Sequence, residues 1–469
     1  MAQDIDQLCI NTIRTLSIDA IQKANSGHPG TPMSMAPVAY TLWQRFLRFD
    51  PADPIWPNRD RFVLSAGHAS MLLYALLYLT EVQAVEPDYE VVGKPSVSLD
   101  DIKSFRQLDS RAPGHPEYRW TSGVEATTGP LGQGIATSVG MAIASKWQGA
   151  RHGAELFDFD VYALAGDGCL MEGVSSEAGS IAGHLKLDNL CWVYDNNHIT
   201  IDGKTSLAYD DDVSARFMGY GWNVALVGDA NDTELLARAF EEFKGEEGRP
   251  TLIIVDSHIG WGSPHKQDTP AVHGEPLGTD EVRETKRAYG WPEDAEFLVP
   301  EGVKEHFADG MGKRGAELHA KWEERLAAYA ARDPGLAAEI DSMQKRELPE
   351  GWDAEIPSFE ADEKGLATRK ASNRVQNAIG KRLPWLLAGS ADLTDSTSVR
   401  FGLPGDGGGD ESEEGGGGAA DFEPGAYDGR QLHYGVREHE SAAISNGLSL
   451  SKLRPLWSTY LTFSDYARP

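Results

Sequence analysis

The amino-acid sequence predicts an α/β protein with mostly parallel, doubly wound sheets in more than one domain. Short apolar runs alternate with helical patterns, and Gly or Asp residues stand where several of these runs end. Strands that are buried on both faces of a parallel sheet have this near-continuous apolar character. The chain has 469 residues, which is too long for a single core, so two or three domains are expected.

The first region contains the clearest alternation of helices and strands. The segment at 157–166 is rich in strand-forming residues and ends at a glycine, and the next two apolar runs are also short and bounded by turn residues. The predicted elements are helices over 38–49, 65–79 and 173–187, and strands over 157–166, 189–197 and 250–260.

A second α/β pattern follows a charged, helical stretch at 303–346 and an irregular, Pro-containing stretch at 348–359. We therefore expect a first domain over 1–320, a linker region over 321–358 and a second domain over 359–469. The segment 405–429 is rich in glycine and acidic residues and is expected to be a mobile loop. In the second domain, helices are predicted over 364–382 and 438–450, and strands over 384–393 and 454–463.

Composition excludes several classes of protein. The 72 acidic and 43 basic residues give a net charge of −29, which disfavours binding to nucleic acid or anionic membranes. This charge is typical either of a salt-rich cytoplasm or simply of a soluble acidic enzyme. No apolar run is long enough to cross a membrane, and the N-terminus lacks the pattern of a signal peptide. The three cysteines, in no metal-ligand spacing, favour a reducing cytoplasm.

Two polar motifs follow consecutive predicted strands. Asp167 lies between glycines in "AGDGCLMEG", and Asn196 and Asn197 end the next strand in "YDNNHIT". Ligands of open parallel sheets bind beyond the carboxyl ends of the strands, and the helix expected from about Gly173 favours an anion at its N-terminus. A carboxylate beside an anion requires a bridging cation. Carboxylate, amide and diphosphate oxygens suit Mg²⁺ or Ca²⁺, although each motif alone would be an ordinary turn.

The order of motifs resembles the transketolase family throughout nearly the whole chain. The combination of "GDG" with "NN" some thirty residues later is similar to the motif for thiamine diphosphate. The resemblance implies the thiamine diphosphate-binding fold, with a complete diphosphate- and metal-binding domain and an incomplete pyrimidine-binding domain. The further motifs are "SGHPGTPM", "SAGHAS", "PGHPE", "TTGPLGQG", "VHGEPLG", "GSADLTDS" and "YGVREHE".

The resemblance also implies roles for residues around the cofactor. Asp167, Asn197 and the carbonyl of Ile199 would bind the metal. Glu438 would meet the pyrimidine ring and promote removal of the thiazolium C2 proton, with the cofactor as electron sink. Glu172 would belong to a carboxylate link between the two active sites of a dimer. The other implied cofactor contacts are Gly129, Leu131, Gly168, Asp392, Tyr460, Phe463 and Tyr466, where Tyr460 replaces the family's more usual Phe.

Four histidines in Gly-flanked loops match family positions and suit proton transfer near neutral pH. These are His28, His68, His115 and His273. Of these, His28 and His273 would also contact substrate, and Arg369 and Ser396 would bind the sugar phosphate. By contrast, His152, His184 and His433 are expected to be structural.

The implied activity is transfer of a two-carbon ketol unit from a ketose phosphate to an aldose phosphate, in the pentose phosphate pathway of the cytoplasm. The family forms homodimers whose cofactor lies between the first domain of one subunit and the pyrimidine domain of the other. Because the sequence ends within the pyrimidine domain, it is expected to lack the last strands and the C-terminal domain. The alternatives are a chain that needs a separate C-terminal half, a non-catalytic subunit, or a related ketol transferase such as dihydroxyacetone synthase; deoxyxylulose-phosphate synthase is disfavoured by "SGHPG" and the histidines.

Overall fold

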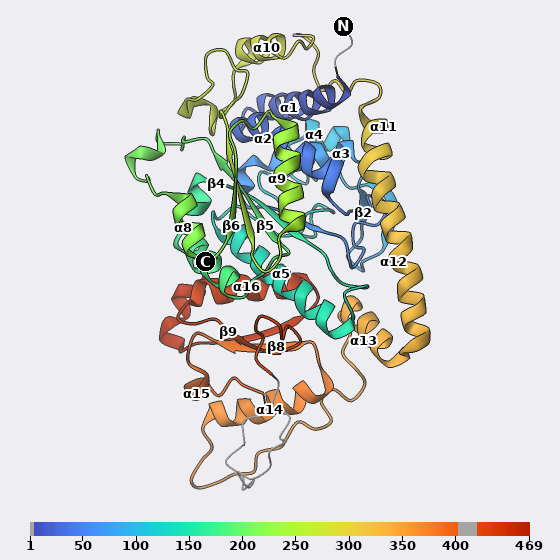
Figure 1. The fold of residues 1–469 in the computed structure, drawn as a ribbon, viewed down its shortest axis with the longest axis vertical. Helices are drawn as coiled ribbons and strands as arrows, with labels where there is room; N and C mark the ends of the chain where they lie inside the picture. The colour runs from blue at the N-terminus through green and yellow to red at the C-terminus, as the bar shows by residue number, and fades with distance from the viewer. Residues whose placement is uncertain (1–3, 402–419) are drawn as a thin grey trace. The chain divides into compact units, whose positions relative to one another are not determined.

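The computed structural model describes residues 4–401 and 420–469, which fold into two compact units (Figure 1). The first unit comprises the chain up to 138 together with 159–323, and the second comprises 139–158 together with 324–469. Each unit contains a parallel sheet. The predicted α/β class is therefore confirmed, and each unit is described separately below.

The first unit is organised around a parallel sheet with the strand order β1-β4-β5-β7-β6. The predicted strands at 157–166, 189–197 and 250–260 correspond to β4, β5 and β7, with slightly narrower bounds. The edge strands β1 and β6 were not predicted, because one is only four residues long and the other is partly exposed. The strands are β1 (Arg61–Leu64), β4 (Val161–Gly166), β5 (Leu190–Asn196), β7 (Thr251–Asp256) and β6 (Asn223–Val227).

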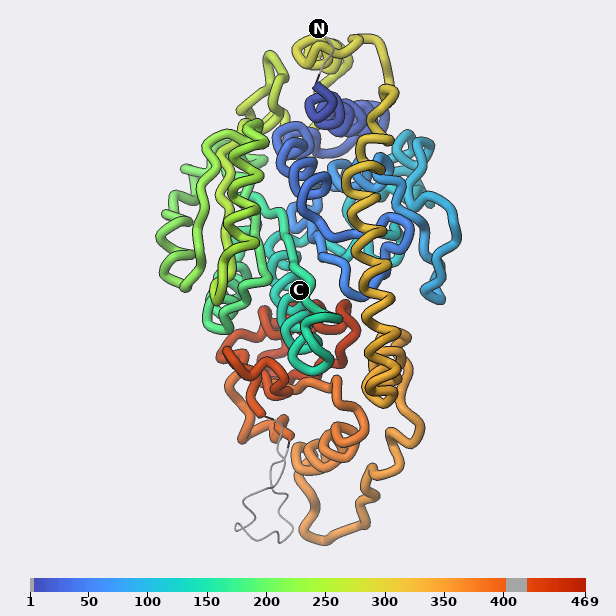
Figure 2. Tube along the Cα trace, turned by 45° about the vertical axis from the view of Figure 1, so that its right-hand side comes forward, coloured from blue at the N-terminus to red at the C-terminus, as the bar shows by residue number. Residues whose placement is uncertain are grey.

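Helices cover both faces of this sheet because its strands alternate their apolar side chains between two cores. Cys191 and Val193 of β5 face a cluster that includes the first three helices and α9. Between them, Trp192 faces the other side, where its indole N–H donates to Ser138 at 2.9 Å and its ring lies 4.6 Å from that of Trp222. The first cluster is covered by α1 (Ile5–Ala24), α2 (Gly30–Thr41), α3 (Ser70–Leu79) and α9 (Thr233–Gly245), which Figure 2 shows as a chain trace.

The predicted helices differ from the observed ones mainly at their ends. The helix expected at 38–49 begins earlier, at Gly30, and ends in a π-helical turn over Leu42–Phe46. The helix expected at 65–79 begins as α3 at Ser70, because a bend at residues 65–66 and a 3-10 turn over Gly67–Ala69 separate it from β1. The remaining elements of the first unit are a hairpin of β2 (Gln83–Val85) and β3 (Val91–Pro95), with α4 (Leu99–Lys103), α6 (Asp167–Met171), α7 (Gly173–His184), α8 (Val213–Gly219) and α10 (Thr279–Ala288). Helix α5 (Gln133–His152) begins in the first unit and continues in the second.

The charged stretch at 303–346 is helical, as predicted. It forms α11 (Val303–Phe307), a π-helical turn (Ala308–Gly312), α12 (Lys313–Arg332) and α13 (Pro334–Lys345). The first part of the expected linker region, 321–345, thus lies in α12 and α13. From 346 to 367 the chain forms turns and irregular structure, in agreement with the irregular stretch expected at 348–359.

The second unit contains a smaller parallel sheet with the strand order β10-β8-β9. The strand expected at 454–463 ends at Ser458, since Leu461–Ala467 form a 3-10 helix, and β9 was not predicted because it has only three residues. Of the expected loop at 405–429, residues 405–419 lie outside the described residues. The elements are β8 (Leu386–Ser390), β9 (Gln431–His433), β10 (Arg454–Ser458), α14 (Thr368–Arg382), α15 (Thr394–Thr397) and α16 (Glu438–Leu450).

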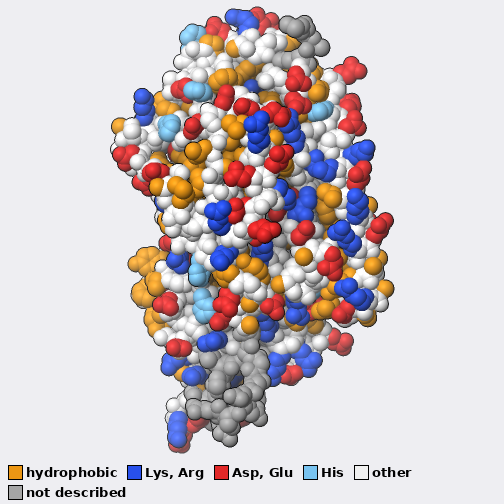
Figure 3. Space-filling view, in the orientation of Figure 1, with side chains coloured by type: hydrophobic (Ala, Val, Ile, Leu, Met, Phe, Trp, Pro, Cys, Tyr) orange, Lys and Arg blue, Asp and Glu red, His pale blue; other side chains and the backbone are white. Residues whose placement is uncertain are grey.

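Charged side chains of both signs lie on the visible face of the molecule, where acidic and basic side chains are interspersed (Figure 3). Among the helices of the described residues, none has both the length and the apolar character needed to span a bilayer.

Candidate functional site

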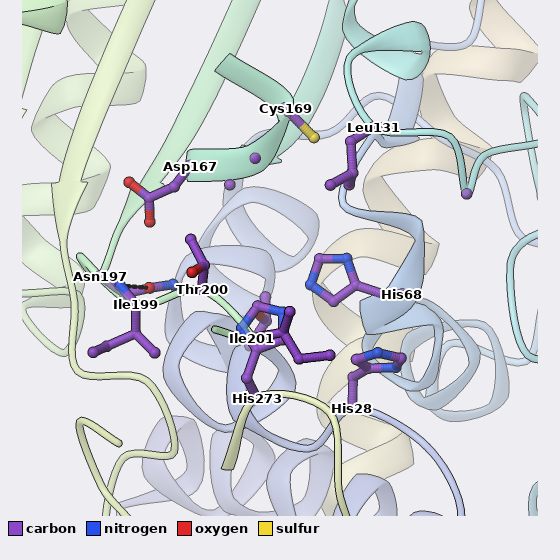
Figure 4. A pocket seen from close by; sticks show the side chains of 14 residues that line it. His28, His68, Leu131, Asp167, Cys169, Asn197, Ile199, Thr200, Ile201 and His273 are labelled. Atoms are coloured by element: carbon purple, nitrogen blue, oxygen red, sulfur yellow. Dashed lines mark hydrogen bonds between the residues drawn. The ribbon is translucent and has the colours of Figure 1, made fainter. Parts of the chain in front are cut away.

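A pocket of about 270 Å³ lies at the carboxyl edge of the first unit's sheet (Figure 4). It brings together most of the predicted residues of this unit. The predicted residues that line it are His28, His68, Gly129, Leu131, Asp167, Gly168, Asn197, Ile199 and His273. Five further residues, Thr31, Gly166, Cys169, Thr200 and Ile201, also line it but were not predicted.

The pairing of β4 with β5 sets the position of Asp167. Gly166 pairs with Asp195, so Asp167 and Asn197 both emerge at the same edge of the sheet. Asp167 is the first residue of α6, a short helix that precedes α7. A Cβ atom added to Gly168 would lie 2.7 Å from the terminal methyl of Leu131, so a larger residue here would have to displace that side chain.

The Asp167 carboxylate is buried and only partly satisfied. Its residue is 4% exposed, and its Oδ1 accepts a hydrogen bond of 2.5 Å from the Tyr194 hydroxyl. Its Oδ2 is buried without a hydrogen-bond partner among the described residues. Burial raises the pKa of Asp167 to about 6, against the opposing effect of the Tyr194 hydrogen bond. A buried carboxylate oxygen without a partner is costly, and a cation would satisfy it.

Neutral oxygens lie on the neighbouring strand end. The Asn197 side chain donates to Asp195 at 2.9 Å, and its Oδ1 accepts from the Ile199 backbone at 3.0 Å, which leaves that oxygen a second lone pair. Asn196 instead donates to Asp256 at 2.7 Å. A carboxylate oxygen, an amide oxygen and a backbone carbonyl form a donor set that fits a hard cation such as Mg²⁺ or Ca²⁺.

Three histidine rings meet at the other side of the pocket. The centroid of His68 lies 5.1 Å from that of His28 and 5.2 Å from that of His273. The fourth predicted histidine, His115, packs beside the pocket, because a Cβ atom on Gly129 would come within 3.4 Å of its ring. The rings therefore converge although their loops are far apart in the sequence.

All four imidazoles are held in the neutral form. Burial lowers the pKa of His28 to about 4, with a further contribution from Arg106. Burial also lowers the pKa of His68, His115 and His273 below the ordinary value. Neutral imidazoles offer one donor and one acceptor nitrogen each, so the cluster suits hydrogen bonding to hydroxyl and carbonyl groups.

A second set of predicted residues lies at the carboxyl edge of the second unit's sheet. Ser390, His433 and Ser458 stand at matching positions at the ends of the three strands. Glu438 begins α16, and its carboxylate accepts a 3.1 Å hydrogen bond from the Thr459 hydroxyl just beyond β10. Asp392 follows β8 and is exposed, with a left-handed φ of 57°. The edge therefore presents two carboxylates.

Three aromatic rings follow β10 at this edge. The Tyr460 and Phe463 rings lie 5.9 Å apart, and those of Phe463 and Tyr466 lie 6.4 Å apart. They are 42%, 37% and 66% exposed, respectively. Such exposed, adjoining rings offer an apolar surface to a ligand or a partner.

The remaining predicted residues are less closely tied to these sets. Ser396 lies in α15, which is joined to β10 by a 2.9 Å hydrogen bond between Ser458 and Thr397. Arg369 is exposed near the start of α14, and no contact between described residues joins it to the others. Glu172, between α6 and α7, is exposed, with its Cβ close to Gly132.

Several residues near the pocket were not predicted, because their role depends on contacts between residues that are distant in the sequence. Cys169 Sγ lies 3.5 Å from Ser65 Oγ, but cysteine spacing gave no hint of this contact. Arg106 reaches His28 from another loop. Thr31 lies within the "SGHPGTPM" motif, so the motif itself was a signal that could have found it. Among the histidines expected to be structural, His152 packs between Trp147 and Phe157, and His433 pairs with Asp421.

The chain belongs to the transketolase family. Residues 5–349 match the family described as "Transketolase, thiamine diphosphate binding domain", and residues 364–469 match "Transketolase, pyrimidine binding domain". The family's cofactor is thus thiamine diphosphate, in agreement with the motif that joins Asp167 to Asn197.

Individual relatives agree with this assignment. The chain is 49% identical to a transketolase of Geobacillus stearothermophilus over 473 residues, covering 100% of this chain and 66% of that protein. It is 43% identical to transketolase 1 of Saccharomyces cerevisiae, covering 99% of this chain and 65% of that protein. The chain therefore spans slightly less than two thirds of the length of these relatives.

Solved structures show the same fold. A variant of Pichia stipitis transketolase in complex with fructose 6-phosphate superposes with a TM-score of 0.90 at 40% identity, covering 99% of this chain and 66% of that one. The transketolase of Leishmania mexicana gives the same TM-score of 0.90 and 40% identity, covering 100% of this chain and 66% of that one.

The buried histidines predict a specific acid dependence of stability. The pKa of His68 is lowered in the folded chain, so below about pH 6.5 the unfolded chain binds more protons and the free energy of unfolding falls as pH falls. Chemical denaturation between pH 7 and 5 measures this effect. The free energy of unfolding should fall less steeply in His68→Gln than in the parent chain, by up to about 1.4 kcal/mol per pH unit.

The control is His265→Gln. The pKa of His265 is raised by its hydrogen bond to Glu281, which stabilises the fold at low pH, so this variant should lose stability more steeply on acidification. Parallel stability curves for the parent and His68→Gln would contradict a neutral, buried His68.

Proposed function

We propose that this chain forms the cofactor site of a transketolase, which transfers a two-carbon ketol unit from a ketose phosphate to an aldose phosphate. The observation that carries the proposal is the buried Asp167 carboxylate, whose Oδ2 has no partner among the described residues, at the carboxyl edge of a parallel sheet. Solved Pichia stipitis transketolases carry titles naming complexes with fructose 6-phosphate and sedoheptulose 7-phosphate, which supports sugar phosphates as the substrate class.

The first unit would hold the diphosphate end of the cofactor. Asp167, Asn197 and the Ile199 carbonyl would bind Mg²⁺ or Ca²⁺. Gly168 would let the backbone approach the diphosphate, and Gly129 and Leu131 would contact the aminopyrimidine. When bound, thiamine diphosphate supplies an electron sink for cleavage beside a carbonyl group.

The second unit would hold the pyrimidine end. The Glu438 carboxylate would meet a nitrogen of the pyrimidine ring, an interaction that strengthens as water is excluded. The rings of Tyr460, Phe463 and Tyr466 would pack against the pyrimidine, with Asp392 beside the cofactor.

The histidines and two residues of the second unit would bind the sugar phosphate. Neutral His28, His68, His115 and His273 would form hydrogen bonds with substrate hydroxyl and carbonyl oxygens, and members of this cluster would transfer protons. Arg369 and Ser396 would bind the phosphate, for which a guanidinium group is well suited.

We further propose a homodimer in which Asp167 and Glu438 of different subunits serve one site, with Glu172 in a carboxylate link between the two sites. The domain limits that accompany this proposal are 1–320 for the diphosphate and metal, 321–358 for the linker region, and 359–469 for the pyrimidine. The three cysteines are free and buried, which agrees with the reducing cytoplasm where we place the protein.

The first test is turnover. Ketol transfer between a ketose phosphate and an aldose phosphate should be measured with the purified chain and thiamine diphosphate, with and without a separately expressed C-terminal third of a relative such as the Geobacillus protein. We expect transfer in at least the supplemented reaction. Cofactor binding without transfer in either reaction would instead favour a non-catalytic subunit.

The second test concerns the metal. Asp167→Ala should weaken Mg²⁺-dependent binding of thiamine diphosphate roughly a hundredfold, because it removes the buried carboxylate oxygen that has no hydrogen-bond partner among the described residues and that would bind the metal. Calorimetric titration with cofactor, with and without Mg²⁺, measures this effect. Glu241→Ala, which removes an exposed carboxylate of α9, is the matched control and should bind normally. Unchanged binding by Asp167→Ala would remove this residue from the metal site.

The third test concerns the shared site. Glu438→Ala alone should bind cofactor but slow C2 proton exchange by orders of magnitude, and Asp167→Ala alone should fail to bind. After subunit exchange, an equal mixture should recover roughly a quarter of the wild-type exchange, because half of the dimers are mixed and each has one intact site. Exchange is followed by NMR and dimer mixing by native mass spectrometry. Mixed dimers without recovered exchange would show that the site is not shared between subunits.

A further inference from the structure

Arg106 reaches into the histidine cluster from the loop that follows α4. Its backbone adopts a left-handed φ of 62°, and its N–H donates to the Ala112 carbonyl at 3.0 Å. Its Nη1 donates to Ser26 Oγ at 2.8 Å, and its Nη2 lies 3.4 Å from His28 Nδ1. Gly114 leaves room for it, since a Cβ atom there would come within 3.1 Å of Arg106 Nε. The guanidinium group is thus held against one particular nitrogen of His28.

This contact determines which His28 nitrogen carries the proton. A guanidinium group has only donors, and it stays protonated in proteins. The nitrogen that faces it must therefore be the acceptor, so Nδ1 is unprotonated. In a neutral imidazole the single proton then resides on Nε2.

The Nε2 end of the ring is the end turned toward the loop of His273. A Cβ atom on Gly274 would lie 3.4 Å from both Cδ2 and Nε2 of His28, so the glycine keeps this end of the ring free of a neighbouring side chain. His28 lines the pocket beside His68 and His273 (Figure 4). Among the described residues none accepts a hydrogen bond from His28 Nε2, so this N–H is available to an oxygen atom of a bound molecule.

The charges around His28 reinforce the neutral form. The groups that face it are Arg106, His68, His115 and His273. No acidic side chain is among these neighbours. Burial is the largest cause that lowers the pKa of His28, to about 4, and the positive charge of Arg106 is the next. A second proton would have to enter at Nδ1, directly against the guanidinium group.

We infer that Arg106 is a positioning residue that fixes His28 as the neutral Nε2–H tautomer, so that His28 donates a hydrogen bond to a substrate oxygen and does not act as a base. The substrate part of this inference rests on the proposed function, whereas the tautomer follows from this chain alone. His28 is thereby assigned to bind and polarise an acceptor oxygen, and the acceptance of protons falls to another group.

The test measures His28 directly, without turnover. Exchange of the imidazole carbon-bound hydrogen for deuterium, followed by mass spectrometry as a function of pH, reports the pKa of individual histidines. Trypsin releases residues 24–45 as a peptide in which His28 is the one histidine. Arg106→Gln should raise the pKa of His28 by about one unit, as expected when a cation within about 4–6 Å is removed. Arg106→Lys keeps the charge and should leave the pKa of His28 low.

A matched control separates local from general charge effects. Arg111→Gln removes the same charge from the same loop, where Arg111 donates to the Trp120 carbonyl and does not face His28. This variant should leave the pKa of His28 unchanged. Equal shifts in Arg106→Gln and Arg111→Gln, or no shift in Arg106→Gln, would overturn the assignment. Circular dichroism of each variant verifies that it is folded. If Arg106→Gln does not fold, NMR of the parent chain identifies the tautomer of His28 instead.

NMR of ¹⁵N-histidine-labelled protein identifies the tautomer, with His28→Gln used to assign the signals. The expected spectrum at pH 7 has a protonated Nε2 and an unprotonated Nδ1 for His28, and the reverse pattern would refute the inference. These readouts need neither cofactor nor substrate. Failure of ketol transfer with the expected tautomer would therefore count against the proposed function only, whereas the wrong tautomer in an active enzyme would count only against the role of Arg106.

Discussion

The parallel pairing of β4 with β5 is the constraint on which the first unit's site depends. With Gly166 opposite Asp195, the residues that follow both strands emerge together, and the first of them is a carboxylate. A shift of one residue would turn each side chain of the strand to the opposite face of the sheet. Trp192 would then exchange places with the smaller Cys191 and Val193, and both cores would be lost together with the site.

Burial disfavours charge on both sides of the pocket, but the charges concerned have opposite signs. It disfavours a negative charge at Asp167 and a positive charge on the histidines, because either charge loses its hydration. At the carboxylate, the Tyr194 hydroxyl satisfies only one of the two oxygens, and the proposed cation would satisfy the other. At the histidines the result is a group of neutral rings able both to donate and to accept. The same burial therefore accounts for both parts of the proposed site: the part for a metal and, beside it, the part for uncharged hydroxyl and carbonyl groups.

Much of this could be predicted from the sequence, because the motifs encode local backbone geometry. The strands that precede Asp167 and Asn197 were predicted from their apolar runs, and Gly168 packs closely against Leu131. Short edge strands such as β1 and β9 offered too few residues for a periodic pattern. The contact between Arg106 and His28 joins positions 78 residues apart, and the local sequence of neither loop predicts it. The site's outline was therefore predictable, whereas the partners that orient its side chains were not.

The edge position of β10 has a consequence for the colloidal behaviour of the protein. Its outer backbone groups pair with no strand among the described residues, and the rings of Tyr460, Phe463 and Tyr466 are exposed just beyond it. Such an edge is a template for association with another chain. The net charge of −29 opposes that association through long-range repulsion, which salt weakens as the screening length shortens. The chains should therefore associate little in dilute buffer. In concentrated salt, where the repulsion is screened, they should associate through the β10 edge.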